Sequence, residues 1–183
     1  MTGPPIQIQE VLLTEDAIRG KVSDLGARIT TEYAGRELIL VCVLRGAVVF
    51  TADLMRRIDL PLSVDFVHAS SYGRGTEPGR VRVNRDIAAD IRGKHVLLVD
   101  CIIDTGETLD FLLRRYRAMA PASLNAAVLL DKQMRRRVPV PLAYRGFAIP
   151  DRFVVGYGLD CAGQFRNLPH VAAIIPPVRP DSF

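Results

Sequence analysis

The stretch Val96-Leu97-Leu98-Val99-Asp100-Cys101-Ile102-Ile103-Asp104-Thr105-Gly106-Glu107-Thr108-Leu109 decides how this chain folds. Four apolar residues run straight into an acidic residue, and a short loop with a second carboxylate, a glycine and two threonines follows. After this loop the apolar residues recur at helix spacing. The pattern predicts a buried parallel strand that ends near Asp100, a loop of the size of a phosphate group and the N-terminus of a helix.

The residues of this loop suit a phosphate ligand. A helix N-terminus offers free N–H groups and the positive end of a dipole. Thr105 and Thr108 add hydroxyl donors, and Gly106 allows the backbone to approach a ligand closely. Asp100 and Asp104 flank the loop, where they can bind hydroxyls, a metal or a proton. A plain β–α turn is the alternative, because the loop lacks the glycine patterns of dinucleotide folds and P-loops.

Strands and helices alternate on both sides of this stretch. Continuous apolar runs of strand length occupy 38–44, 62–67 and 123–130. Apolar residues at helix spacing follow the N-cap candidate Thr14 and recur at 47–58. Such alternation is typical of a parallel sheet with crossover helices, so the predicted fold class is α/β, with a parallel-sheet core flanked by helices.

Two regions break the alternation. Residues 70–86 are small, polar and rich in glycine, which favours a flexible flap loop with Arg82 to Ile87 as the returning arm of a hairpin. Residues 131–176 contain short β-prone pieces, which predict a small C-terminal hood over the carboxyl edge of the sheet, where α/β proteins bind ligands. We expect a single domain, 1–183, with a core at about 10–131 and a hood formed by about 132–176 and the N-terminal arm.

The composition is that of an ordinary globular protein, with 49% apolar and 24% charged residues. The net charge of +4 fits a small anionic ligand as well as RNA, so it decides little. Cys42, Cys101 and Cys161 are an odd count without paired spacing, which points to a reducing cytoplasm. The sequence predicts neither a signal peptide nor a transmembrane helix.

Further motifs occur in a fixed order along the chain. They are Leu44-Arg45-Gly46-Ala47, Ser71-Tyr72-Gly73, Leu129-Leu130-Asp131-Lys132, Phe153 to Asp160, and Phe165-Arg166. With residues 99–109 they resemble the purine phosphoribosyltransferase family, specifically the hypoxanthine(-guanine) enzymes, over roughly 10–176. The resemblance implies the type I phosphoribosyltransferase fold and purine salvage. The 5-phosphoribosyl group of phosphoribosyl pyrophosphate (PRPP) would pass to hypoxanthine, and guanine is expected as a second base, with Mg²⁺ as cofactor.

The resemblance also implies a role for each site residue. Asp104 would be the catalytic base that faces purine N7, with a simple helix cap as the alternative role. The residues implied to bind PRPP are Asp100, Asp104, Thr105, Gly106, Glu107 and Thr108. Those implied to bind pyrophosphate are Leu44, Arg45, Gly46 and Arg166, with a non-proline cis peptide often found at the position of Leu44-Arg45. Those implied to bind the purine are Lys132, Phe153, Val154 and Asp160. Ser71 and Tyr72 would belong to the flap, and Asp100 and Asp160 would bind Mg²⁺.

Asp100-Cys101 departs from the family pattern, which has two adjacent acids. A thiol is a poor magnesium ligand, so the departure predicts weaker PRPP binding or a higher magnesium requirement. It also suggests a site that is sensitive to oxidation. Cys161 stands where the family commonly has tyrosine, which is a change in packing beside Asp160.

Three alternatives stay open from the sequence. The Cys101 departure and the arginine runs 114–115 and 135–137 would suit a non-catalytic PRPP-binding regulator on the same fold. A xanthine-preferring transferase is the second, and a nucleic-acid patch on the arginine runs is the third, although a solvated face is the more ordinary explanation of such runs. By resemblance we expect a homodimer or homotetramer, formed through surfaces of 15–34 and 44–58, without nucleic acid or membrane.

Overall fold

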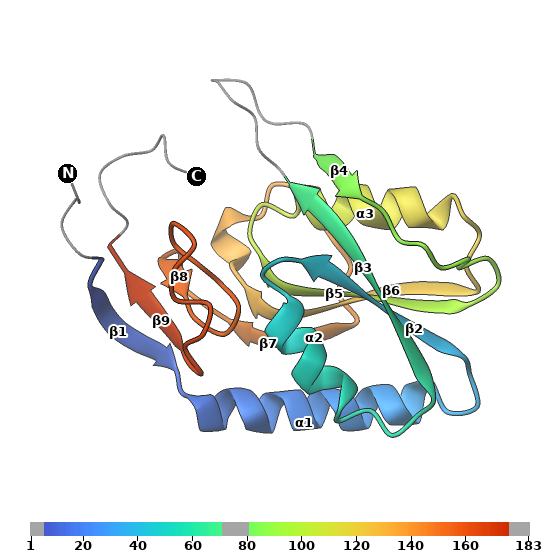
Figure 1. Cartoon of the computed structure of the whole chain (residues 1–183), viewed down its shortest axis with the longest axis horizontal. Helices are drawn as coiled ribbons and strands as arrows, with labels where there is room; N and C mark the ends of the chain where they lie inside the picture. Colours follow the sequence, from blue (N-terminus) through green and yellow to red (C-terminus); the bar gives the residue numbers. More distant parts are fainter. Residues whose placement is uncertain (1–5, 71–80, 176–183) are drawn as a thin grey trace.

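The computed structural model describes residues 6–70 and 81–175, which alternate between strands and helices (Figure 1). The elements in chain order are β1 (Ile8–Leu13), α1 (Glu15–Glu32), β2 (Leu38–Leu44), α2 (Val48–Met55), β3 (Leu62–Ser70), β4 (Arg82–Arg85), β5 (His95–Ile103), α3 (Glu107–Arg117), β6 (Ser123–Asp131), a 3-10 turn (Gln133–Arg135), β7 (Tyr144–Ala148), β8 (Phe153–Val155) and β9 (Val171–Ile174).

Within the described residues, six strands form the main sheet in the order β4-β3-β2-β5-β6-β7. All neighbours in it are parallel except β4, which pairs antiparallel with β3 at the edge. The parallel core and the hairpin arm at Arg82 are therefore confirmed. Because β2, β5 and β6 lie side by side and parallel, the loops that follow them meet at one edge of the sheet.

The strand β5 is longer than the sequence predicted. It continues past Asp100 to Ile103, because Ile102 pairs with Leu130 and Ile103 with Asp131 of β6. Asp100 therefore belongs to the strand, and the loop between β5 and α3 contains only 104–106. The helix α2 is shorter than expected and ends at Met55 instead of 58.

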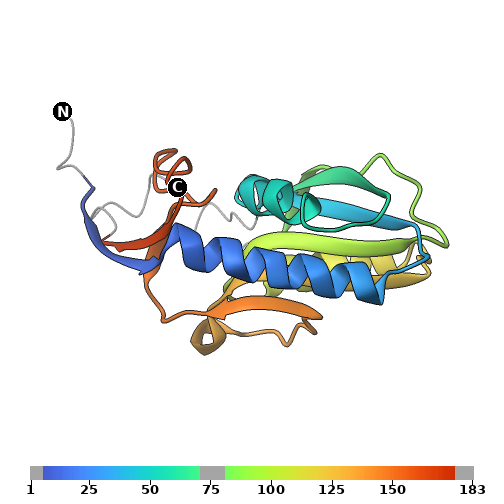
Figure 2. The same ribbon diagram turned by 90° about the horizontal axis from the view of Figure 1, so that it is seen from below.

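Helices cover the two faces of the main sheet. α1 and α2 pack on one face, around Ile18, Leu25, Phe50 and Leu54, and α3 packs on the other through Leu109, Leu112 and Tyr116. Figure 2 shows α1 lying along the sheet with α2 beside it. α1 begins as predicted, because the Thr14 hydroxyl accepts a hydrogen bond from the Ala17 N–H at 3.2 Å.

A second, three-stranded sheet of order β1-β9-β8 lies beside the core and joins the N-terminal arm to the end of the described chain (Figure 1). It corresponds to the expected hood. One strand was assigned wrongly: β7 was placed in the hood, but it pairs with β6 in the main sheet. We therefore propose a single domain whose hood consists of this second sheet, including β1 of the N-terminal arm, and the turns that follow β8. The C-terminal part of the hood then begins after residue 148. No helix in the described part of the chain has the length and apolar character needed to cross a membrane.

Candidate active site

The loop between β5 and α3 has the shape of an anion site. α3 starts at Glu107, and the residue at its N-cap position is Gly106, which has no side chain to cap the helix. The Thr105 hydroxyl accepts from the Glu107 N–H at 3.4 Å, which is a long contact for a hydrogen bond. The predicted set Asp104, Thr105, Glu107 and Thr108 is thus brought together at one helix N-terminus.

Gly106 is required here for a reason other than the predicted one. Its φ is +91°, in the left-handed region, and a Cβ on it would lie 2.6 Å from the Val138 carbonyl oxygen. The Thr105 carbonyl also accepts from the N–H groups of Arg137 and Val138, at 2.9 and 3.1 Å. The missing side chain therefore makes room for the segment 136–140, which packs against the loop and fixes its shape.

Asp100 projects from β5 with its carboxylate partly buried. Burial raises the pKa of this carboxyl from 3.8 to about 7, although the backbone N–H groups of Cys101 and Ile102 oppose the rise. In the part of the chain that is described, no cation pairs with Asp100, and no three or more acidic, histidine or cysteine side chains gather into a metal cluster. Mg²⁺ commonly uses one or two carboxylates and completes its shell with water and substrate phosphates. A desolvated carboxylate without a counter-charge fits such a cation.

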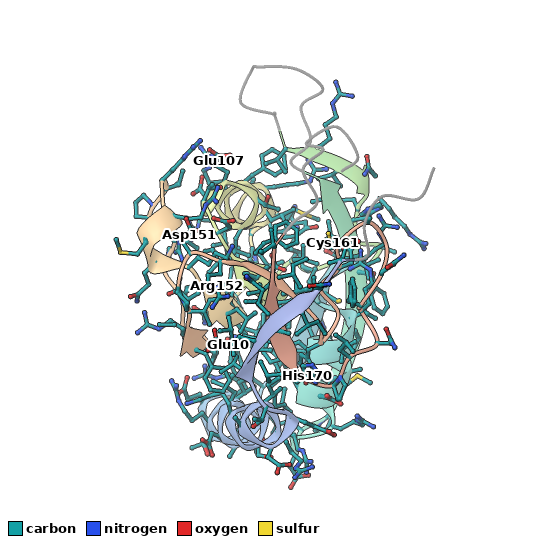
Figure 3. The ribbon with its side chains drawn as sticks, turned by 90° about the vertical axis from the view of Figure 1, so that its left-hand side faces the viewer. Glu10, Glu107, Asp151, Arg152, Cys161 and His170 are labelled. Carbon is teal, nitrogen blue, oxygen red and sulfur yellow. The ribbon has the colours of Figure 1, made fainter. Side chains whose placement is uncertain are left out.

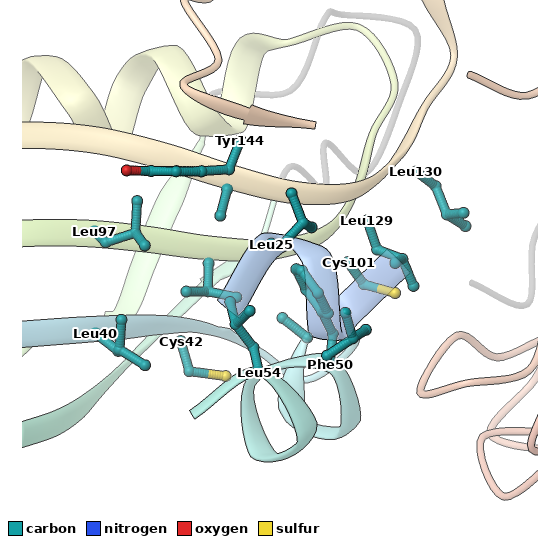
Figure 4. Close-up of a cluster of buried hydrophobic side chains, with 14 of the residues drawn as sticks. Leu25, Leu40, Cys42, Phe50, Leu54, Leu97, Cys101, Leu129, Leu130 and Tyr144 are labelled. Carbon is teal, nitrogen blue, oxygen red and sulfur yellow. The ribbon is translucent and has the colours of Figure 1, made fainter. Parts of the chain in front are cut away.

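Cys101 does not share the surroundings of Asp100. Its side chain is fully buried, and its sulfur lies 3.6 Å from the Tyr157 carbonyl oxygen. Figure 4 shows it in the apolar cluster with Phe50 and Leu129. Neighbouring residues of a strand point to opposite faces, so a thiol at 101 fills the core while Asp100 points the other way. This position argues against a direct effect of the thiol on ribose or magnesium, and we now expect a packing role.

The buried thiols give a simple prediction about oxidation. Cys42, Cys101 and Cys161 are all free and buried, and burial raises the pKa of each thiol. Because the thiolate is the reactive form, the native protein should react with an aromatic disulfide reagent at least about 100-fold more slowly than a free thiol, and three thiols should react quickly in guanidinium. Rapid labelling of the native protein at Cys101, located by mass spectrometry, would restore the idea of an oxidation-sensitive site.

Lys132 lies beside Asp104. It follows β6, and its backbone N–H donates to the Ile103 carbonyl at 3.0 Å. Its side chain is only 8% exposed, and its Nζ lies 3.8 Å from Asp104 Oδ2 and 3.8 Å from Asp151 Oδ1. A lysine at the end of a strand is usually in solvent, so this burial between two acids marks the position as unusual.

The arginine run 135–137 is only in part the solvated face that was expected: Arg135 and Arg137 are exposed, but Arg135 and Arg136 also pair with acids of the chain. Arg135 Nε lies 2.8 Å from Asp104 Oδ1. Arg136 forms an ion pair with the buried Asp131, and Arg136 Nε also donates to the Asp104 carbonyl at 3.3 Å. Two of the three arginines thus belong to the structure around Asp104. Nothing in the bare sequence distinguished them from solvated arginines.

The predicted pyrophosphate loop has the expected geometry. The Leu44-Arg45 peptide is cis. A Cβ on Gly46 would lie 3.4 Å from the Leu159 side chain, and one on Gly158 would lie 2.2 Å from the Gly46 carbonyl oxygen. The loop after β2 therefore packs directly against the turn that carries Leu159.

Asp160 and Arg166 lie together beyond this turn. Arg166 Nη2 lies 2.5 Å from Asp160 Oδ1, and its Nη1 donates to the Gly158 carbonyl at 2.6 Å. Because Gly158 packs on Gly46, the structure brings Arg166 and Asp160 to the predicted pyrophosphate loop.

The other predicted residues lie away from the contacts described above or outside the described residues. Val154 is buried in the core. Phe153 is partly exposed and packs against a small buried cluster in the hood, formed by Val155, Cys161, Ala172 and Ile174. Ser71 and Tyr72, the flap residues, lie outside the described residues. His95 lies at a strand end, 2.7 Å from the Ser123 hydroxyl, as an ordinary structural histidine.

Comparison with known proteins places this geometry in a family. A family model described as a phosphoribosyl transferase domain matches residues 9–162. The chain is 46% identical over 169 residues to the hypoxanthine phosphoribosyltransferase of Salmonella typhimurium, covering 91% of this chain and 95% of that protein. A crystal structure of a hypoxanthine-guanine phosphoribosyltransferase from Bacillus anthracis matches with a TM-score of 0.86 and 42% identity, over 93% of this chain and 100% of that one.

A further relative is longer than this chain. The chain is 42% identical over 172 residues, 93% of its length, to the bifunctional protein TilS/HprT of Listeria monocytogenes, and it spans 26% of that protein. The family model matches most of the chain, and the two relatives above are more than 40% identical to it over more than 90% of its length. The chain therefore belongs to the phosphoribosyltransferase family, on its hypoxanthine(-guanine) branch.

Proposed function

We propose that the chain transfers the 5-phosphoribosyl group of PRPP to hypoxanthine, and also to guanine, in purine salvage. The observation that carries the proposal is the approach of Lys132 Nζ to Asp104 Oδ2, 3.8 Å apart at the end of the phosphate loop. An ammonium and a carboxylate at this spacing can address the two neighbouring sites that define a 6-oxopurine, the exocyclic oxygen and N7.

In the proposed reaction the residues of the site accept a proton, bind the 5′-phosphate and neutralise the pyrophosphate. Purine N9 forms a bond to C1′ while the bond from C1′ to pyrophosphate breaks, and Asp104 accepts the proton from N7. The N–H groups at the start of α3 and the hydroxyls of Thr105 and Thr108 hold the 5′-phosphate at the other end of the ribose. Arg166 leaves Asp160 to neutralise the departing pyrophosphate, a task that suits the fork of a guanidinium group.

Mg²⁺ is the cofactor of this proposal. Asp100 would hold one ion on the ribose side, and Asp160 would hold a second ion on the pyrophosphate side. When bound, the ion neutralises phosphate charge and orients the pyrophosphate. Phe153 would stack on the base, and Val154 would offer backbone groups to its edge. The pyrophosphate would be wrapped by Leu44, Arg45 and Gly46. Ser71 and Tyr72 would cover the reacting centre.

The regulator alternative loses one of its supports. It rested on the Asp100-Cys101 departure and on free arginine runs, but Arg135 and Arg136 are paired with acids of the same chain.

We further propose that the protein works in the cytoplasm as a homodimer or homotetramer. The exposed apolar side chains of Val48, Met55 and Phe66, on α2 and β3, support subunit pairing.

The test is release of pyrophosphate from PRPP and Mg²⁺ with one base at a time. Hypoxanthine and guanine should give rapid release and uracil none, because uracil lacks the imidazole N7 that Asp104 would address. Release with xanthine above that with hypoxanthine would favour the xanthine-preferring alternative, and no release with any base would favour a regulator. Light scattering of the same sample gives the oligomer number.

A further inference from the structure

Asp151, a residue that the sequence analysis did not single out, is one of two acids that face the Lys132 ammonium. Lys132 Nζ is 3.8 Å from Asp104 Oδ2 and 3.8 Å from Asp151 Oδ1. Both distances are too long for hydrogen bonds, so charge attraction holds the ammonium between two carboxylates. Water screens this attraction only weakly on the lysine side, because only 8% of the Lys132 side chain is exposed.

Arg135 completes a ring of alternating charges. Its Nε lies 2.8 Å from Asp104 Oδ1 and its Nη1 lies 3.5 Å from Asp151 Oδ1. Two cations and two anions thus face one another, with Asp104 on one side of the ring and Asp151 on the other. Arg135 is about half exposed and can move into solvent, whereas the Lys132 side chain is nearly buried where it stands.

The backbone around Asp151 is held on both sides. The Ile149 N–H donates to the Asp131 carbonyl at 3.0 Å, and the Arg152 N–H donates to the Pro150 carbonyl at 2.9 Å. Arg152 is in turn paired with Glu10 of β1 at 2.5 Å, and Figure 3 shows the two near Asp151. The backbone on both sides of Asp151 is therefore held by the main sheet and the hood together. The carboxylate itself is 48% exposed and is held by its charge contacts with Lys132 and Arg135.

Binding of the base must open this ring at Asp104. If Asp104 turns to purine N7, Lys132 keeps only one of its two counter-charges, the Asp151 carboxylate. A nearly buried ammonium without any counter-charge is costly and would turn away toward water. We propose that Asp151 is a positioning residue that holds Lys132 toward the 6-oxygen of the base and thereby sets the preference for 6-oxopurines. This inference rests on the proposed roles of Asp104 and Lys132, and Asp151 itself touches no substrate.

The test compares two bases in the variant Asp151→Asn. Hypoxanthine carries the 6-oxygen, and unsubstituted purine lacks it. A hydrogen bond from a charged donor contributes ~1.5–3 kcal/mol, so kcat/KM for hypoxanthine should fall ~10- to 100-fold. The inhibition constant of purine, measured in competition with hypoxanthine, should change less than about threefold, because no 6-oxygen is lost. Asp24→Asn, an exposed acid on α1, is the matched control and should change neither value.

The outcomes separate this inference from the proposed function. An equal loss for both bases would show that Asp151 only maintains the structure, and no loss for either would show that Lys132 does not need it. Lys132→Gln is measured in parallel. If Lys132→Gln loses the discrimination between the bases and Asp151→Asn keeps it, the positioning role is refuted and the proposed lysine role stands. If Lys132→Gln keeps the discrimination, the lysine role itself is wrong.

Discussion

Asp104→Asn should lower kcat with hypoxanthine by about 100- to 10,000-fold, the usual contribution of a positioned general base. The amide keeps the size of the side chain but cannot accept the N7 proton, so the loss should appear in kcat with little change in the dissociation constant of PRPP. The fold should persist, because the Asp104 side chain is 40% exposed and its ion pairs are partly in solvent. Initial rates of pyrophosphate release and calorimetric titration with PRPP measure the two quantities.

Asp110→Asn is the control for this experiment. Asp110 lies in the first turn of α3 and pairs with Arg114 at 2.7 Å, one turn along the same helix. Removing its charge changes the field at the helix N-terminus without touching the proposed base, so kcat should stay within a few-fold of the original. If Asp104→Asn retains its turnover, Asp104 does no more than cap or position the loop, which was the alternative role that the sequence left open.

The parts of the molecule that the sequence predicted well are those that follow from local pattern. The β2 run at 38–44 and the start of α1 at Thr14 needed only periodicity and capping, and both were confirmed. β5 was predicted too short, because Asp100 is a polar residue within a strand whose partners in β6 cannot be seen from the chain alone. β7 was placed in the hood for the same reason, since its membership of the main sheet depends on a partner far away in sequence.

The proposed site divides in a similar way. A resemblance to a family could point to Asp104, Lys132 and Arg166, because these residues occupy recognisable motifs. It could not point to Asp151 or Arg135, whose place beside Asp104 and Lys132 depends on how the segments after β6 and β7 fold back. It also gave no sign that the side chains of Asp100 and Cys101 would lie in different surroundings, one partly exposed and one in the core.

Asp100 should make the metal-free protein less stable as the pH rises. Its folded pKa of about 7 is higher than its value of 3.8 in the absence of the fold. Between these values the folded protein binds more protons than the unfolded one, so the free energy of unfolding falls with rising pH and the penalty is complete above pH 7. The difference corresponds to a ceiling of about 4 kcal/mol. Asp100→Asn removes this penalty and should therefore raise the free energy of unfolding at pH 8 but not at pH 4.

Urea unfolding in a chelator, at both pH values, measures this change, and Asp160→Asn serves as the comparison. Asp160 is paired with Arg166, so its replacement removes an ion pair and should not stabilise the protein. Mg²⁺ with PRPP should reverse the order, because a cation binds the deprotonated carboxylate and stabilises the state that holds it. The original protein should then gain more stability than Asp100→Asn. An Asn variant that is no more stable than the original at pH 8, or that gains as much from Mg²⁺ and PRPP, would mean that Asp100 is neither a strained carboxylate nor a metal ligand. The two results together would show that this position gives up stability in the empty protein for a charge that the substrate complex uses.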